Sequence, residues 1–117
     1  MTVAVVARDL IIATRIADAG ARAGVEVRRF DHPSQLPPAD AVTLVLIAWD
    51  ERRPGWAEQL LAWHAARPEG ALPRLVLFGP HTDLEAHAAA RAAGLGPMWA
   101  RSKLLSEIPG LLANAGV

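Results

Sequence analysis

Residues 44–55 read LVLIAWDERRPG, an apolar run that ends on a carboxylate, Asp50, with Pro54 four residues later. A continuous apolar run that is too short for a helix is typical of a strand buried on both faces of a sheet. We therefore predict a central strand over 42–49, with Asp50 at the point where this strand reaches solvent. Asp50 is then either a functional acid held by a rigid scaffold or the first polar residue of a loop.

Apolar runs and helical patterns alternate along the rest of the chain. Strands are predicted at 3–7, 25–30, 75–78 and 98–100, and the alternation of VEVRRF at 25–30 is typical of a half-exposed edge strand. Helices are predicted from the N-cap Asp9 to Gly24, and from Gly55 to a stop at Pro68 and Gly70. A third helix is predicted from a capping box of Thr82 and Glu85 to Gly94. In the last helix Pro109 is tolerated if the regular helix starts near Ser106.

Five strands separated by helical patterns predict a parallel sheet that is covered on both faces. The segment DHPSQLPPAD at 31–40 carries three prolines and leaves room for a helical turn at most. We therefore expect an α/β, flavodoxin-like three-layer sandwich over 1–117, one domain with strand order 2-1-3-4-5 and a second helix that is short or missing. In this fold, ligand chemistry lies at the carboxyl ends of the first and third strands.

Composition excludes several classes of function. The 117 residues hold 12 Lys plus Arg and 12 Asp plus Glu, so no basic excess favours nucleic acid or an anionic membrane. The absence of cysteine excludes disulfides, thiolate metal sites and a cysteine nucleophile. No signal-peptide or membrane-helix pattern occurs, so we expect a cytoplasmic protein. Eleven of the twelve basic residues are Arg, which hints at a GC-rich bacterial source.

With these elements in place, the chain resembles the receiver domain of bacterial response regulators over nearly its whole length. The phosphoacceptor Asp of that family, followed four residues later by Pro, falls on Asp50 and Pro54. LVLFGPHTDLEAHAAARAAG, residues 75–94, is similar to the fourth strand and following helix, which end in an Ala-Gly pair. Seven residues after Gly94, where the family has a basic residue, stands Arg101. The resemblance implies a signalling domain whose phosphoacceptor would be Asp50.

The rest of the catalytic set departs from the family pattern. The positions of the acidic pair that binds Mg²⁺ are Ala7 and Arg8, with Asp9 one residue late. Gly79 stands at the position of the switching hydroxyl residue. At the position of the Lys-Pro pair stand Arg101 and Ser102.

These departures bear directly on phosphorylation. Phosphoryl transfer to a carboxylate needs Mg²⁺ and fixed cations to offset the developing charge. Asp9 and Asp50 could ligate Mg²⁺, but Arg8 would place a competing cation in the same cleft. We therefore expect Arg8, Arg101 or both to pair with Asp50, which would lower the pKa of this acid and reduce its availability as a nucleophile.

The first functional hypothesis is a stand-alone pseudo-receiver, not an enzyme and without a cofactor, that regulates by contact with another protein. One alternative is a small-molecule binder that holds an anionic ligand with Arg8, Asp50, Arg52 and Arg101. The other is a response regulator that is still phosphorylated, with Mg²⁺ between Asp9 and Asp50. All three hypotheses place the important residues in one crevice.

Two further groups of residues are candidates for a site. In receivers, the face of the fourth helix, fifth strand and fifth helix commonly serves dimerisation or partner docking. Here that face would include Arg91, Trp99, Lys103 and Leu104, with a protein partner or a second copy of the chain as the occupant. The group formed by His81, Asp83 and His87 does not have the spacing of a zinc site, so no metal site is predicted.

Overall fold

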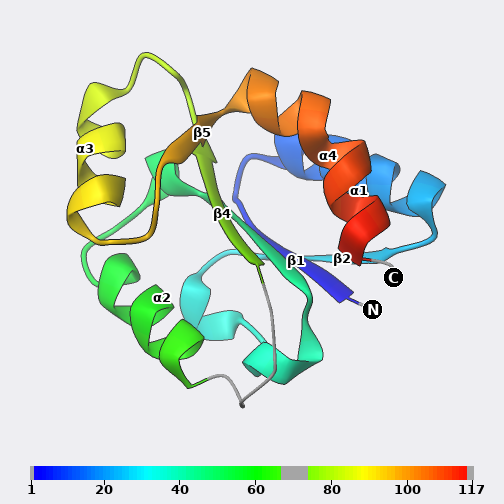
Figure 1. Cartoon of the computed structure of the whole chain (residues 1–117), viewed down its shortest axis with the longest axis horizontal. Helices are drawn as coiled ribbons and strands as arrows, with labels where there is room; N and C mark the ends of the chain where they lie inside the picture. Colours follow the sequence, from blue (N-terminus) through cyan, green and yellow to red (C-terminus); the bar gives the residue numbers. More distant parts are fainter. Residues whose placement is uncertain (1, 67–73, 116–117) are drawn as a thin grey trace.

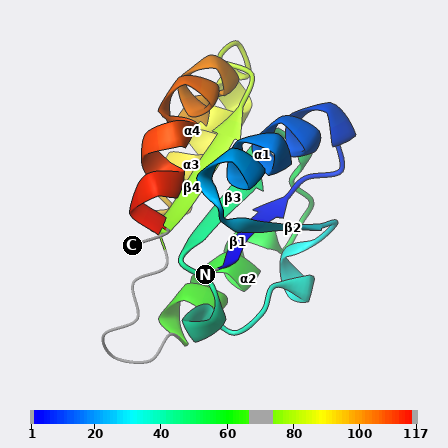
Figure 2. The same cartoon turned by 90° about the vertical axis from the view of Figure 1, so that its right-hand side faces the viewer.

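The computed structural model describes residues 2–66 and 74–115. The strands are β1 (Thr2–Val6), β2 (Glu26–Phe30), β3 (Leu44–Ala48), β4 (Arg74–Gly79) and β5 (Met98–Ala100). The helices are α1 (Leu10–Ala23), α2 (Trp56–Ala65), α3 (Leu84–Ala92) and α4 (Arg101–Ala115). All strand pairs are parallel, in the order β2-β1-β3-β4-β5. Helices α1 and α4 cover one face of the sheet, and α2 and α3 cover the other (Figures 1 and 2). The predicted flavodoxin-like fold and strand order are confirmed.

The centre of the sheet is strand β3, whose five residues are all buried. Its side chains alternate between two apolar cores, as the period of a strand requires. Leu44, Leu46 and Ala48 join the core under α1 and α4, whereas Val45 and Ile47 join the core under α2 and α3. An apolar run that serves two cores in this way explains why the sequence shows no polar alternation at 44–48.

Between β2 and β3 the chain forms two short 3₁₀ turns, η1 (Pro33–Gln35) and η2 (Ala39–Ala41), instead of a helix. The prediction of a short or missing second helix is therefore confirmed. His32 caps η1, because its Nδ1 accepts a hydrogen bond from the Ser34 amide at 3.1 Å. This turn brings His32 against α2, where its ring meets the Trp56 ring edge-on at 5.7 Å between centroids.

The predicted limits of two helices are wrong. Asp83 caps α3, since its Oδ1 accepts a hydrogen bond from the Ala86 amide at 3.0 Å, so the expected capping box at Thr82 is not formed. Helix α4 starts at Arg101, five residues before Ser106, and thus contains Pro109 in its interior. Because Pro109 has no amide hydrogen, the Leu105 carbonyl loses its usual helical donor. Pro109 lies on the exposed side of α4, where water can take that role.

The other helix limits agree better with the sequence. Asp9 caps α1 by accepting a hydrogen bond from the Ile11 amide, and Gly24 ends this helix in the left-handed conformation at φ 71°. The predicted stop of α2 at Pro68 and Gly70 lies outside the described residues. Across the described ranges, no helix has both the length and the apolar character needed to cross a membrane.

Candidate functional site

Asp50 and Arg101 meet at the carboxyl end of the sheet. Asp50 lies directly after β3, in the 3₁₀ turn η3 (Trp49–Glu51), and Arg101 is the first residue of α4, directly after β5. Nη2 of Arg101 donates a hydrogen bond to Asp50 Oδ2 at 3.1 Å and lies 3.9 Å from Asp9 Oδ2. The side chain of Asp50 is 17% exposed and that of Arg101 37% exposed. One guanidinium therefore bridges the two carboxylates that the sequence places at the ends of β1 and β3.

The second oxygen of Asp50 is enclosed by β4 and β5. Oδ1 is buried and has no hydrogen-bond partner. A Cβ atom at Gly79 would lie 3.2 Å from this oxygen and 2.9 Å from Sδ of Met98. The backbone of Gly79 therefore leaves only enough room for Asp50 and Met98, and any side chain at this position has to displace one of them.

The pKa of Asp50 is raised above its ordinary value, because burial penalises the charged carboxylate more than Arg101 stabilises it. The prediction that the ion pair would lower this pKa is wrong for the net effect. Arg101 does act in the predicted direction, but it contacts only Oδ2, while Oδ1 is buried without a donor. The sequence shows the potential partner of an acid but not the depth at which that acid is buried.

Glu51, which no sequence motif marks, organises the loop after β1. Its Oε1 accepts a hydrogen bond from the Arg8 amide at 2.7 Å, and its Oε2 accepts one from the Asp9 amide at 3.1 Å. The carboxylate thus ties η3 to the loop that carries Asp9 and fixes where the Asp9 side chain stands relative to Arg101. In the sequence, the only sign of this role is that Glu51 is an acid directly after Asp50. Both residues lie in a turn that faces the end of the neighbouring strand β1.

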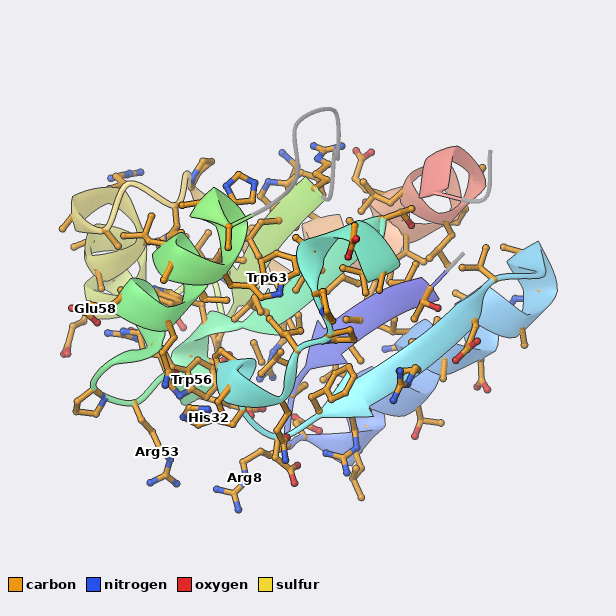
Figure 3. All side chains as sticks on the ribbon, turned by 90° about the horizontal axis from the view of Figure 1, so that it is seen from below. Arg8, His32, Arg53, Trp56, Glu58 and Trp63 are labelled. Carbon is orange, nitrogen blue, oxygen red and sulfur yellow. The ribbon has the colours of Figure 1, made fainter. Side chains whose placement is uncertain are left out.

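The prediction was that Arg8, Arg101 or both would pair with Asp50, and the structure forms only the pair with Arg101. Ala7 is fully buried and Arg8 exposed, so the Arg8 side chain leaves the opposite side of the backbone from the core. Figure 3 shows this side chain pointing away from the body of the domain. Of the two arginines that the sequence offered to Asp50, only Arg101 reaches it.

Arg52 is also occupied. Its Nη1 donates a hydrogen bond to the Trp49 carbonyl at 3.3 Å, and its Nη2 lies 3.7 Å from Glu85. The four residues predicted to hold an anionic ligand, Arg8, Asp50, Arg52 and Arg101, therefore do not converge on one open space. A groove of about 570 Å³ does border Asp50, between the start of α2 and the start of α3, and it is lined by both acids and arginines.

The predicted partner surface is only partly formed. Leu104 is fully buried in the core under α1 and α4, so its assignment to an accessible surface is wrong. Arg91 is exposed on α3, and Trp99 is half-buried on β5. Nζ of Lys103 lies 4.5 Å from the centroid of the Trp99 ring, and the Arg74 guanidinium lies 5.5 Å from it. Trp99 is thus already in contact with two cations of its own chain.

The histidine group has structural roles. Asp83 caps α3, and Nε2 of His87 lies 3.2 Å from the His81 carbonyl oxygen. Within the described residues, no three His, Cys, Asp or Glu side chains come together in a way that could hold a metal ion.

Comparisons with known proteins add no relative. No protein-family model matches the chain, and no curated protein matches it.

The raised pKa of Asp50 predicts a pH dependence of stability. The folded chain holds the Asp50 proton more tightly than the unfolded chain, so this residue favours folding at low pH and loses that effect as the pH rises through its raised pKa. Relative to wild type, Asp50→Asn should therefore become more stable as the pH increases from about 4 to about 7. Urea unfolding of both proteins at a series of pH values measures this difference. If the stability of Asp50→Asn relative to wild type instead decreases as the pH rises, the raised pKa of Asp50 is contradicted.

Proposed function

We propose that this chain is a receiver-like signalling domain, active in the bacterial cytoplasm through contact with another protein, whose acceptor carboxylate Asp50 is kept out of phosphoryl chemistry by Arg101. The observation that carries the proposal is the bridge that Arg101 makes between Asp50 and Asp9. These are the two acids that a receiver of this sequence could offer to Mg²⁺. In this chain the positive charge between the two acids is the guanidinium of Arg101, which is part of the protein and cannot diffuse away as a metal ion can.

The chemistry of a guanidinium supports a permanent block. Arginine stays protonated in proteins, so at any pH above the raised pKa of Asp50 both members of the pair are charged. Mg²⁺ requires oxygen ligands at about 2.0–2.1 Å in near-octahedral geometry. Its entry between Asp9 and Asp50 would require Arg101 to leave both carboxylates. Oδ2 is engaged by Arg101 and Oδ1 is buried, so no oxygen of Asp50 is free to attack a phosphorus atom.

The surroundings of Gly79 support the same proposal. A receiver that switches needs a hydroxyl side chain here to follow the phosphoryl group. At this position Met98 and Asp50 fill the space into which such a side chain would extend. Regulation by this domain would then depend on its presence and on its partner, not on a phosphorylation-driven change at β4.

The alternative of an anionic ligand beside Asp50 has weaker support, because Arg52 and Arg101 are already paired with acids. A ligand there would have to compete with Glu85 for Arg52 and with Asp50 for Arg101. The alternative of a working response regulator is decided by the following experiment.

The purified chain is incubated with Mg²⁺ and a small phosphodonor such as acetyl phosphate, and its intact mass is followed with time. We expect no mass increase of one phosphoryl group in the wild type beyond that of Asp50→Asn. The Asn variant is the matched control, since any mass increase that it shares lies elsewhere. A phosphoryl group that is added to the wild type and absent from Asp50→Asn contradicts the proposed block.

A further inference from the structure

Among the residues that the structure describes, two arginines at the carboxyl end of the sheet form no ion pair. Arg29 pairs with Asp31, Arg52 with Glu85, and Arg101 with Asp50. Across residues 2–66 and 74–115, no ion pair involves the side chain of Arg8 or of Arg53, and both residues are exposed. The pKa of Asp31 is lowered mainly by Arg29 and also by Arg8. Within the described residues, however, neither the Arg8 nor the Arg53 guanidinium is held in an ion pair.

A series of contacts brings these arginines to one place. The Arg8 amide donates a hydrogen bond to Glu51, two residues before Arg53. The Trp56 amide donates one to the Arg53 carbonyl at 3.2 Å, and the Trp56 ring contacts the His32 ring. Arg8, His32 and Arg53 thus follow the ends of three adjacent strands, β1, β2 and β3. Figure 3 shows Arg8 and Arg53 extending in the same direction from this end of the domain, with His32 and Trp56 at their base.

The two rings at this place add hydrogen-bond donors. Nδ1 of His32 accepts from the Ser34 amide, so the hydrogen of the neutral ring is on Nε2, which can donate. Trp56 is 2% exposed, and its Nε1 is buried with no hydrogen-bond partner. An indole N–H can only donate, and leaving a buried donor unpaired is costly. The residues around Trp56 therefore supply donors and positive charge.

The acids near this cluster are already engaged. Glu51 accepts from the amides of Arg8 and Asp9 with both of its oxygens. Asp31 pairs with Arg29, and Asp9 caps α1 and faces Arg101. Glu58, on α2, points away from Arg8 and His32 in Figure 3. Glu51, Asp31 and Asp9 therefore already have partners other than the guanidiniums of Arg8 and Arg53.

We infer that Arg8, Arg53 and His32 form a binding site for a phosphate-type dianion, with the buried Trp56 ring packed against His32 at its base. Two guanidiniums can each contact oxygens of a phosphate in parallel, and the geometry of Arg suits such bidentate contacts. The ligand is either inorganic phosphate or the phosphate monoester of a small metabolite. This site is separate from the Asp50–Arg101 pair and does not depend on the proposed function.

The test is a titration of the ¹⁵N-labelled chain with sodium phosphate at constant ionic strength, followed by the indole N–H signal of Trp56 and the backbone amides of Arg8 and Arg53. We expect a saturable shift of these signals. Arg8→Gln and Arg53→Gln should each weaken binding by about tenfold or more, because each removes one of two charged contacts. Arg22→Gln, which removes an exposed arginine from the far end of α1, is the matched control and should change binding by less than about twofold.

A parallel titration with glycerol phosphate separates the two sources. Both ligands carry a phosphate group. The ligand with the lower Kd shows whether the site takes the free ion or a monoester. The inference is overturned if neither ligand gives a saturable shift below about 10 mM. It is also overturned if Arg22→Gln weakens binding as much as Arg8→Gln, because binding would then depend on the net charge of the protein and not on the position of Arg8. Far-UV circular dichroism of each variant confirms that the fold is retained.

Discussion

Replacing Arg101 with methionine is expected to lower the free energy of unfolding by about 1–3 kcal/mol at neutral pH, because the Asp50 carboxylate is left buried without a partner. A fully buried pair would cost more on loss of one partner, but Arg101 is 37% exposed and water can enter its place. Without Arg101, the pKa of Asp50 should rise further, since Arg101 is the group that opposes the effect of burial.

The loss should therefore be largest at neutral pH and should shrink as the pH falls through the raised pKa of Asp50, where this carboxylate takes up a proton. Urea unfolding of wild type and Arg101→Met at several pH values measures it. Arg91→Met, which alters an exposed arginine on α3, is the matched control and should stay within about 0.5 kcal/mol of wild type.

A double variant checks that the two side chains are coupled. With Asp50→Asn in place, removal of Arg101 should cost much less than it costs in the wild type. Equal costs in both backgrounds would show that Arg101 stabilises the chain through contacts other than Asp50.

Gly79→Ser should destabilise the chain by about 1–3 kcal/mol, because its Cβ would lie 2.9 Å from Met98 Sδ and 3.2 Å from Asp50 Oδ1. The substitution supplies the hydroxyl that the receiver resemblance assigns to this position. It therefore also tests whether the structure has room for that hydroxyl. Thermal unfolding monitored by circular dichroism is the measurement.

The matched control is Gly110→Ser. Gly110 lies inside α4 with no atom within 4 Å of an added Cβ, so a side chain meets open space there. This variant should be neutral or more stable by a few tenths of a kcal/mol, because glycine is a poor residue for a helix interior. Equal unfolding temperatures of Gly79→Ser and Gly110→Ser would show that Met98 and Asp50 do not pack tightly against Gly79.

The fold was predictable from the sequence because its strongest signals are local. The run at 44–48 has to be buried on both faces, and the prolines at 33, 37 and 38 prevent a full second helix. The limits of α4 were not predictable in the same way. This helix follows β5 without a connecting loop, so there is no separate capping residue in the sequence to mark its start.

The candidate site was predictable in position and only in part in chemistry. The spacing of Asp50 and Arg101 places both at strand ends, and strand order brings those ends together. The direction of Arg8 depends on the alternation of side chains after β1, where Ala7 takes the inward place. The roles of Glu51 and Gly79, and the pKa of Asp50, depend on how closely β4, β5 and η3 approach one another, which is a property of the packed structure.

The proposal that Arg101 occupies the place of the metal can be tested by a Mg²⁺ titration of the ¹⁵N-labelled wild type, followed by the backbone amides of Asp9, Asp50 and Arg101. We expect no saturable shift of these signals at Mg²⁺ concentrations up to about 10 mM, because the ion would have to displace a guanidinium from both carboxylates. Saturable binding below that concentration, with shifts centred on Asp9 and Asp50, would contradict it.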